Sequence, residues 1–237
     1  MAWFLSQLQM FFAPESLGLL AKATGMTLAL TFFGCVSGFL AAFLVVMARQ
    51  APGKAGLPLR AVAILFVEMF RRIPFLVITY LVLFFLAAFV KGASLFIIAI
   101  VAISIYATAY LSEIIRTGFE SVPRQQIEAA QAMNFSRWQT LRHVIVPQSW
   151  PVILPPAFAF MVAFVKDTSL VSQIGVFELA FRGRELVNHG MSGLVAFGMI
   201  SLIYFLLSYP LTRLGRSLEL RLASSRHQKS ERGVRTA

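Results

Sequence analysis

The sequence is poor in charged residues and in cysteine. Only 13% of its 237 residues are charged, and only 10 are acidic, whereas charged residues make up about 25% of an average soluble domain. The one cysteine, Cys35, lies inside an apolar run, which excludes a disulfide framework and a cysteine-based metal cluster. A phosphate-binding G-x-x-x-x-G-K-[ST] motif is also missing, because Ala55 follows Gly53-Lys54 and position 48 is alanine. We therefore predict no bound metal or nucleotide.

Apolar residues dominate the chain instead. They make up 58% of it, and the mean hydropathy is +0.77. A bilayer core about 30 Å thick needs about 20 apolar residues in a helix. These values predict an all-α integral membrane protein, with five transmembrane helices at about residues 23–48, 73–90, 93–112, 150–165 and 191–211.

The distribution of basic residues predicts the orientation. Sixteen of the 21 basic residues fall on one side of the membrane if the central polar loop and the C-terminus share that side. The positive-inside rule then places the N-terminus outside and the C-terminus in the cytoplasm. The five remaining basic residues are then placed outside: Lys22, Lys91, Lys166, Arg182 and Arg184.

The chain divides into three parts. Residues 1–18 are too short to span and are expected to lie at the outer interface. Residues 19–215 form the transmembrane domain, with its polar loop at about residues 118–148. Residues 216–237 form a basic tail, for which composition predicts disorder. Contact with anionic lipid accounts for the charge of the tail better than nucleic-acid binding does.

The third span carries the most polar face of any span, with Ser104, Thr108 and Ser112 four residues apart and Glu113 at its end. Two interpretations fit this spacing. The side chains could line a solute pathway, or they could form hydrogen bonds between helices, which is the commoner use of small polar residues in membrane bundles.

The fourth apolar run is short and contains three prolines, so we expect a broken helix that ends at the charged pair Lys166-Asp167. Broken helices at membrane depth often form solute sites. Asp167 would then bind a ligand ammonium or pair with a neighbouring cation, with Thr168 and Ser169 beside it. An ordinary charge pair at the outer interface is an alternative.

The central loop, Ser121–Pro147, predicts two short helices joined at a sharp bend. Pro123 begins the first helix, and Asn134 tolerates the left-handed conformation that ends it. Ser136 caps a second helix, 137–143, which Pro147 would end. Arg124 and Glu128 are spaced to pair along the first helix. His143 and Glu128 lack a matching nucleophile, so we predict that the chain is not an enzyme.

These residues carry a resemblance to a known family. The string EAAQAMNFSRWQTLRHVIVPQ resembles the EAA loop of bacterial ABC-importer permeases. In this chain the Glu-Ala-Ala of the motif is Glu128, Ala129 and Ala130. Asn134 replaces the usual glycine, and Pro147 is the proline at the end of the motif. The strings YLSEIIRTG, KDTSL and IGVFEL resemble the polar amino acid permeases, the histidine, glutamine, arginine and opine group. EMFRRIPFL resembles a further motif of that group, with Arg72 and Ile73 replacing glycine and threonine.

The resemblance implies a type I importer (MetI-like) permease in the bacterial inner membrane. Two such subunits would form the pathway. We expect the second one to be a related sister subunit and not another copy of this chain. An extracytoplasmic binding protein would deliver the amino acid. A pair of separate ATPase subunits would bind ATP and Mg²⁺ and receive the EAA loop through residues Arg124, Glu128, Ala129, Ala130, Asn134 and Pro147.

Other functions stay open at this point. An opine or another small solute could be the substrate. A self-contained secondary transporter would predict inverted repeats or buried ionisable relays, and the sequence contains neither. A membrane scaffold that recruits partners through the basic tail is a third possibility.

Overall fold

Helices are the only regular secondary structure among the described residues. The computed structural model describes the backbone of residues 2–235 and the side chains of residues 3–222. Four helical segments in the described part are long and apolar enough to cross a membrane, or five if one bent helix pair counts as a span. In chain order the elements are α1 (Ala2–Phe11), α2 (Pro14–Arg49), α3 (Leu57–Arg72), α4 (Phe75–Phe89), α5 (Leu95–Glu120), α6 (Arg124–Ala132), α7 (Arg137–Thr140), the π-helix η1 (Leu141–Ile145), α8 (Val146–Asp167), the 3₁₀-helix η2 (Thr168–Ile174), α9 (Leu179–Asn188) and α10 (Gly193–Arg235).

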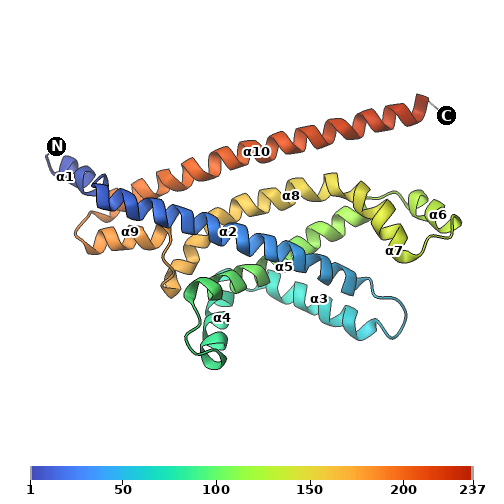
Figure 1. Cartoon of the computed structure of the whole chain (residues 1–237), viewed down its shortest axis with the longest axis horizontal. Helices are drawn as coiled ribbons and strands as arrows, with labels where there is room; N and C mark the ends of the chain where they lie inside the picture. The colour runs from blue at the N-terminus through green and yellow to red at the C-terminus, as the bar shows by residue number, and fades with distance from the viewer. Residues whose placement is uncertain (1, 236–237) are drawn as a thin grey trace.

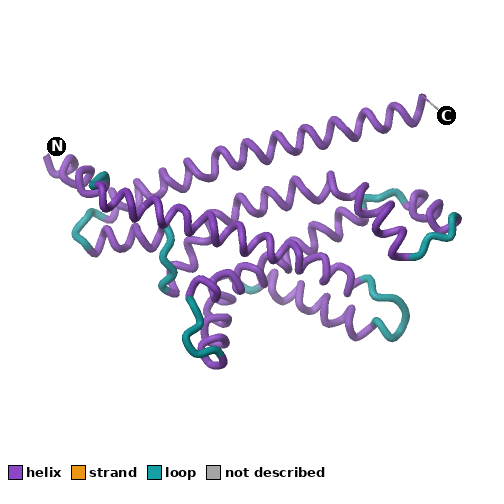
Figure 2. Tube along the Cα trace, in the orientation of Figure 1, coloured by secondary structure: helices purple, strands orange, loops and turns teal. Residues whose placement is uncertain are grey.

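The long helices lie in an elongated bundle whose two ends differ. α10 runs along one side beside α8, and α3 and α4 lie on the opposite side (Figure 1). α1 and α9 lie at one end, which we call the α9 end, and α6 and α7 lie at the other, the α6 end. Most connecting loops lie at these two ends (Figure 2). Most loops therefore lie beyond the ends of the long apolar helices and not along their sides.

α2 packs along α5 at close range because small residues face the contact. A Cβ atom added at Gly38 would lie 2.6 Å from Cβ of Ala107 and 3.0 Å from the carbonyl oxygen of Ser104. A Cβ at Gly34 would overlap the side chain of Ile103 in the same way. Small residues let two membrane helices approach this closely and gain dispersion contacts. This pair forms the centre of the bundle.

The second predicted span is one helix, close to the expected residues 73–90, but it is short. α4 covers Phe75–Phe89, which is 15 residues, and meets α3 at an angle of 115°. Pro74, the N-cap of α4, lacks an N–H, and the residue before a proline avoids the helical conformation, so the chain bends at Ile73-Pro74. α4 alone is too short to count as a candidate span, so a span at this place has to consist of the bent pair α3 and α4.

The fourth span is longer and more regular than expected. α8 contains Pro151, Pro155 and Pro156 and still continues as one helix of 22 residues. The expected break comes only after Asp167, where η2 takes over and ends at Gly175 in a left-handed conformation, with φ 89°. Prolines are tolerated inside membrane helices when neighbouring groups satisfy the freed carbonyls.

The last helix extends through the segment for which the sequence predicted disorder. α10 begins at the fifth span and continues to Arg235, which includes most of the basic tail. Once a span has formed a helix, each further residue adds a hydrogen bond without a new nucleation cost. Residues 236–237 lie outside the described residues.

Candidate functional site

The bend in the central loop has the backbone geometry that the sequence predicted. Asn134 has φ 58° and is the only described non-glycine residue with positive φ. The N–H of Phe135 donates to the carbonyl of Ala130 at 3.0 Å, and the N–H of Asn134 donates to that of Gln131 at 2.9 Å. The bond from Phe135 back to Ala130 is the 6→1 bond of a Schellman motif, which ends a helix at a left-handed residue. Asparagine thus makes the turn that glycine makes in the motif.

The second helix of the loop begins at a capping box. The Oγ of Ser136 accepts from the N–H of Gln139 at 3.3 Å, and the Gln139 side chain accepts from the N–H of Ser136 at 2.8 Å. This reciprocal pair satisfies two backbone donors that the helix start would leave free. The predicted cap is confirmed, and it fixes the direction in which α7 leaves the bend.

The end of this helix was predicted wrongly. Pro147 does not stop it, because α7 passes through η1 directly into α8, where Pro147 occupies the first turn. In η1 the N–H of Val146 donates to the carbonyl of Leu141, five residues back. This wider turn rearranges the hydrogen bonds next to a proline that cannot donate one. We call residues 124–145 the knob, and the knob is thus continuous with a long apolar helix.

The motif residues of the knob divide into exposed and buried ones. Glu128 and Ala129 are exposed, whereas Ala130 is fully buried beneath the bend. The predicted ion pair between Arg124 and Glu128 is not formed among the described residues. Exposed pairs of this kind gain little, and the order with arginine first is the weaker one. Glu128 is therefore free to meet another molecule.

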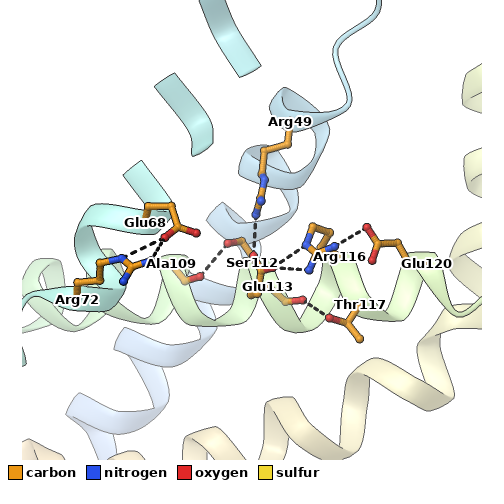
Figure 3. Close-up of polar contacts among 9 residues, drawn as sticks. All are labelled: Arg49, Glu68, Arg72, Ala109, Ser112, Glu113, Arg116, Thr117 and Glu120. Carbon is orange, nitrogen blue, oxygen red and sulfur yellow. Dashed lines mark hydrogen bonds and ion pairs between the residues drawn. The ribbon is translucent and has the colours of Figure 1, made fainter. Parts of the chain in front are cut away.

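A cluster of ion pairs joins the end of α2 to the last turns of α5 (Figure 3). The Glu113 carboxylate accepts from Arg49, at the end of α2, at 2.7 Å, and contacts Arg116 at 2.5 Å. Arg116 also contacts Glu120, one turn further along α5, at 2.5 Å. Glu113 was a candidate pathway residue, and the structure places it in this partly buried network. Figure 3 also shows the separate, exposed pair of Glu68 and Arg72 on α3, at 2.6 Å.

The hydroxyls predicted for the pathway lie mainly between α2 and α5. Ser104 lies 2.6 Å from the hydroxyl of Ser37 on α2, and Thr108 donates to the carbonyl of Gly38 at 3.3 Å. Ser112 is buried and donates to the carbonyl of Ala109 within α5. These contacts are the ones that the interhelical interpretation of this face predicts.

Asp167 lies at the point where α8 changes into η2. The residue is exposed, and its carboxylate forms no ion pair with a described residue. Thr168 is buried and donates to the carbonyl of Val165 at 2.7 Å, and Ser169 is half-buried. An aromatic cluster packs between α5 and the same part of α8, with Tyr106 and Phe164 ring centres 5.8 Å apart. Asp167 and Ser169 are thus the accessible polar groups of this segment.

A buried carboxylate that the sequence did not indicate lies at the α9 end. Glu178 is 0% exposed and caps α9 by accepting from the N–H of Phe181 at 2.8 Å. The hydroxyl of Tyr204, on α10, donates to Glu178 at 2.6 Å, and that of Thr27, on α2, lies 3.5 Å away. Burial raises the pKa of the Glu178 carboxyl above its ordinary value, although these hydrogen bonds act in the opposite direction. One carboxyl group thus connects three helices.

A second buried charge lies one turn further along α9. Arg182 is 7% exposed, donates to Ser16 and contacts Glu185, each at 3.3 Å. The only sequence signal for Glu178 was the IGVFEL string, which shows a glutamate between apolar residues but not its partners. No group of three or more metal-binding side chains occurs in the part of the chain that the structure describes.

Comparisons with known proteins agree on one family. Residues 45–224, which include the knob and Asp167, match the family of binding-protein-dependent transport system inner membrane components. The L-cystine transport system permease protein TcyB of Bacillus subtilis is 32% identical over 83% of each chain. The glutamine transport system permease protein GlnP of Escherichia coli is 31% identical over 86% of this chain and 93% of its own length.

Solved structures show the same fold. The crystal structure of an amino acid ABC transporter with histidines aligns with a TM-score of 0.80 and 28% identity, covering 87% of this chain and 95% of the other. An inward-facing MetNI methionine ABC transporter aligns with a TM-score of 0.70 at 21% identity, which shows a shared fold.

Proposed function

The chain belongs to the family of binding-protein-dependent transport system inner membrane components, and from this premise we propose that it is the permease subunit of an ATP-driven importer for polar amino acids. It is a multi-pass inner membrane subunit and not the ATPase of its complex. The relatives named for cystine and glutamine transport support the amino acid class. An opine or another small solute is the alternative substrate, and a self-contained secondary transporter is the less favoured alternative function.

The observation that carries the proposal is the shape of the knob. A Schellman turn at Asn134 and a capping box at Ser136 hold two short helices at a fixed bend. α7 then continues through η1 into α8 with no flexible linker between them. A partner that moves the knob therefore also moves a membrane helix.

In this proposal the knob docks on the ATPase through Arg124, Glu128 and Ala129, and the buried Ala130 supports the bend from within. ATP and Mg²⁺ bind to the ATPase pair, whose closure displaces the knob. The network around Glu113 then transmits the displacement, because it connects α5, which leads directly into the knob, with the end of α2. Asn134 and Pro147 act through backbone shape and not through contact.

The orientation follows from the same assignment. The α6 end faces the cytoplasm, where the ATPase lies, and the α9 end faces the extracytoplasmic binding protein that delivers the substrate. The chain therefore begins outside and ends inside. Residues 1–18 lie at the outer interface, residues 19–215 form the transmembrane domain and residues 216–237 contact anionic lipid at the inner face.

For the substrate pathway we propose the segment from Asp167 to Ser169. Asp167 is an accessible carboxylate that forms no ion pair within 4 Å among the described side chains, so it can bind the ammonium group that every amino acid carries. Thr168 stabilises the backbone at this point through its hydrogen bond to the carbonyl of Val165. The remaining candidate residues of the pathway would hold its wall in place from α5: Ser104, Thr108, Ser112 and Glu113. A second permease, a sister subunit, would complete the pathway on its other side.

The experiment is reconstitution of the complete transporter in proteoliposomes with its ATPase and binding protein. ATP hydrolysis and uptake are measured across a panel of amino acids and opines. One or a few polar amino acids should stimulate both. Uptake that needs no ATPase subunit would contradict the proposal and favour a secondary transporter. Asp167→Ala should reduce uptake, and wild-type uptake of every substrate in that variant would remove Asp167 from the site.

A further inference from the structure

Two large apolar side chains on the knob are mostly exposed to solvent. Trp138 is 64% exposed and Met133 is 62% exposed, and they lie on either side of the bend at Asn134. Neither forms a hydrogen bond or an aromatic ring contact among the described residues. Phe135, between them in sequence, does pack, edge to face against His143 with ring centres 6.2 Å apart. The fold uses Phe135 and leaves Trp138 and Met133 exposed.

A pocket adjoins the exposed tryptophan. It has a volume of about 540 Å³ and lies between the knob and the end of α2 with its following loop, where Met47, Pro52, Ile127 and Trp138 are among its lining residues. One side of the Trp138 ring therefore borders a space, so packing does not fix the ring. Burying tryptophan removes about 150–250 Å² of surface from water, so its exposure is costly unless a partner covers it.

The surroundings favour a protein partner over lipid. The bend between α6 and α7 lies farthest from the long apolar helices at this end of the bundle (Figure 1). Its neighbours Gln131, Arg137, Gln139 and Arg142 are exposed and polar. Tryptophan, methionine and arginine are the residue types enriched at protein interfaces, and tryptophan and arginine dominate hot spots.

We propose that Trp138 and Met133 form an apolar anchor that inserts into a hydrophobic site on the ATPase subunit, separate from the contact made by the motif residue Glu128. This inference rests on the proposed function, because it assigns a further part of the same docking surface. Glu128 contributes charge, whereas the anchor contributes most of the buried apolar area. The basic side chains of Arg137 and Arg142 next to the anchor fit an acidic rim around that site.

The first test measures the affinity of the purified ATPase for the permease in nanodiscs. Trp138→Ala should weaken binding by at least about 10-fold, as loss of an interface tryptophan does. Trp138→Phe should restore most of it. Trp3→Ala is the matched control, because Trp3 is 61% exposed at the opposite end of the bundle, and it should leave binding unchanged. Wild-type affinity in Trp138→Ala would overturn the anchor.

The second test does not depend on whether Trp138→Ala folds normally. A photoreactive benzoylphenylalanine at position 138 of the assembled transporter should crosslink to the ATPase. Crosslinks to lipid alone would place Trp138 in the interfacial aromatic belt, and crosslinks within this chain alone would place it in the subunit. Either result overturns the proposal.

Glu128→Lys separates the two levels of the argument. If it uncouples the transporter while Trp138→Ala binds like the wild type, the anchor is wrong and the docking function stands. If neither variant affects ATPase binding or coupling, the proposed function of the knob fails as well.

Discussion

At the scale of the residue, Glu178 is the group whose environment departs most from what its sequence context indicates. Two of its hydrogen-bond partners, Thr27 and Tyr204, lie 151 and 26 positions away in the sequence. No local pattern could predict that these three residues meet. A glutamate between apolar neighbours is as typical of an ordinary helix cap as of a connection between three helices.

The raised pKa of Glu178 predicts a pH dependence of stability. A carboxyl group whose pKa is higher in the folded state costs stability once the pH is high enough to ionise the unfolded chain. Stability should therefore fall as the pH rises from about 4.5, the ordinary value, until it passes the folded pKa. Thermal unfolding of the purified protein between pH 4 and 8 measures this. Glu178→Gln should flatten the profile, and an unchanged slope would contradict the assignment.

Glu113 predicts a different effect, because its carboxylate separates two arginines. Glu113→Gln leaves Arg49 and Arg116 partly buried next to each other without the negative charge between them. We expect a loss of about 1–3 kcal/mol of stability. Glu68→Gln is the control, since Glu68 and Arg72 form an exposed pair that contributes about 0–1 kcal/mol. Equal unfolding midpoints for the two variants would remove Glu113 from a structural role.

At the scale of the element, the contact between α2 and α5 depends on glycine. Gly38→Ala places a methyl group 2.6 Å from Cβ of Ala107, so the helices must separate, at a cost of about 1–3 kcal/mol. Gly25→Ala is the matched change in the same helix, where nothing lies within 4 Å, and it should be neutral or stabilise by about 0.5–1 kcal/mol. Unfolding in detergent compares them. A stable Gly38→Ala protein would contradict the close packing.

The bend of the knob gives a second prediction at this scale. Asn134→Gly should keep or slightly improve coupling, because glycine adopts φ 58° without strain. Asn134→Val should cost about 1–2 kcal/mol at the bend and reduce the ratio of substrate transported to ATP hydrolysed. Equal ratios in the two variants would show that the left-handed turn does not matter for function.

The elements of the knob were predictable because local chemistry specifies them. Pro123, Asn134 and Ser136 act on backbone groups within a few residues, so the sequence alone indicated both helices and the bend. The course of the chain after α7 was not predictable in this way. Whether Pro147 ends a helix or sits in its first turn depends on the π-turn before it, and a proline is compatible with either.

At the scale of the whole molecule, hydropathy located all five apolar runs but did not show that the second helix is short and sharply bent against α3. The angle of 115° between α3 and α4 depends on how both helices pack against α5, which no window of composition records. The pathway residues had the same difficulty. Their spacing was consistent with a polar wall and, as the commoner use, with contacts between helices, and only the position of α2 shows which contacts form.

The account as a whole claims that force enters through the knob and reaches the membrane helices through α5 and α8. Its most direct test is Glu128→Lys in the reconstituted transporter, with uptake and ATP hydrolysis measured in the same vesicles. Glu15→Lys makes the same charge change at an exposed position of the α9 end and serves as the control. The account predicts that Glu128→Lys inserts normally and loses uptake while ATP is still hydrolysed. Wild-type uptake per ATP in Glu128→Lys would contradict it.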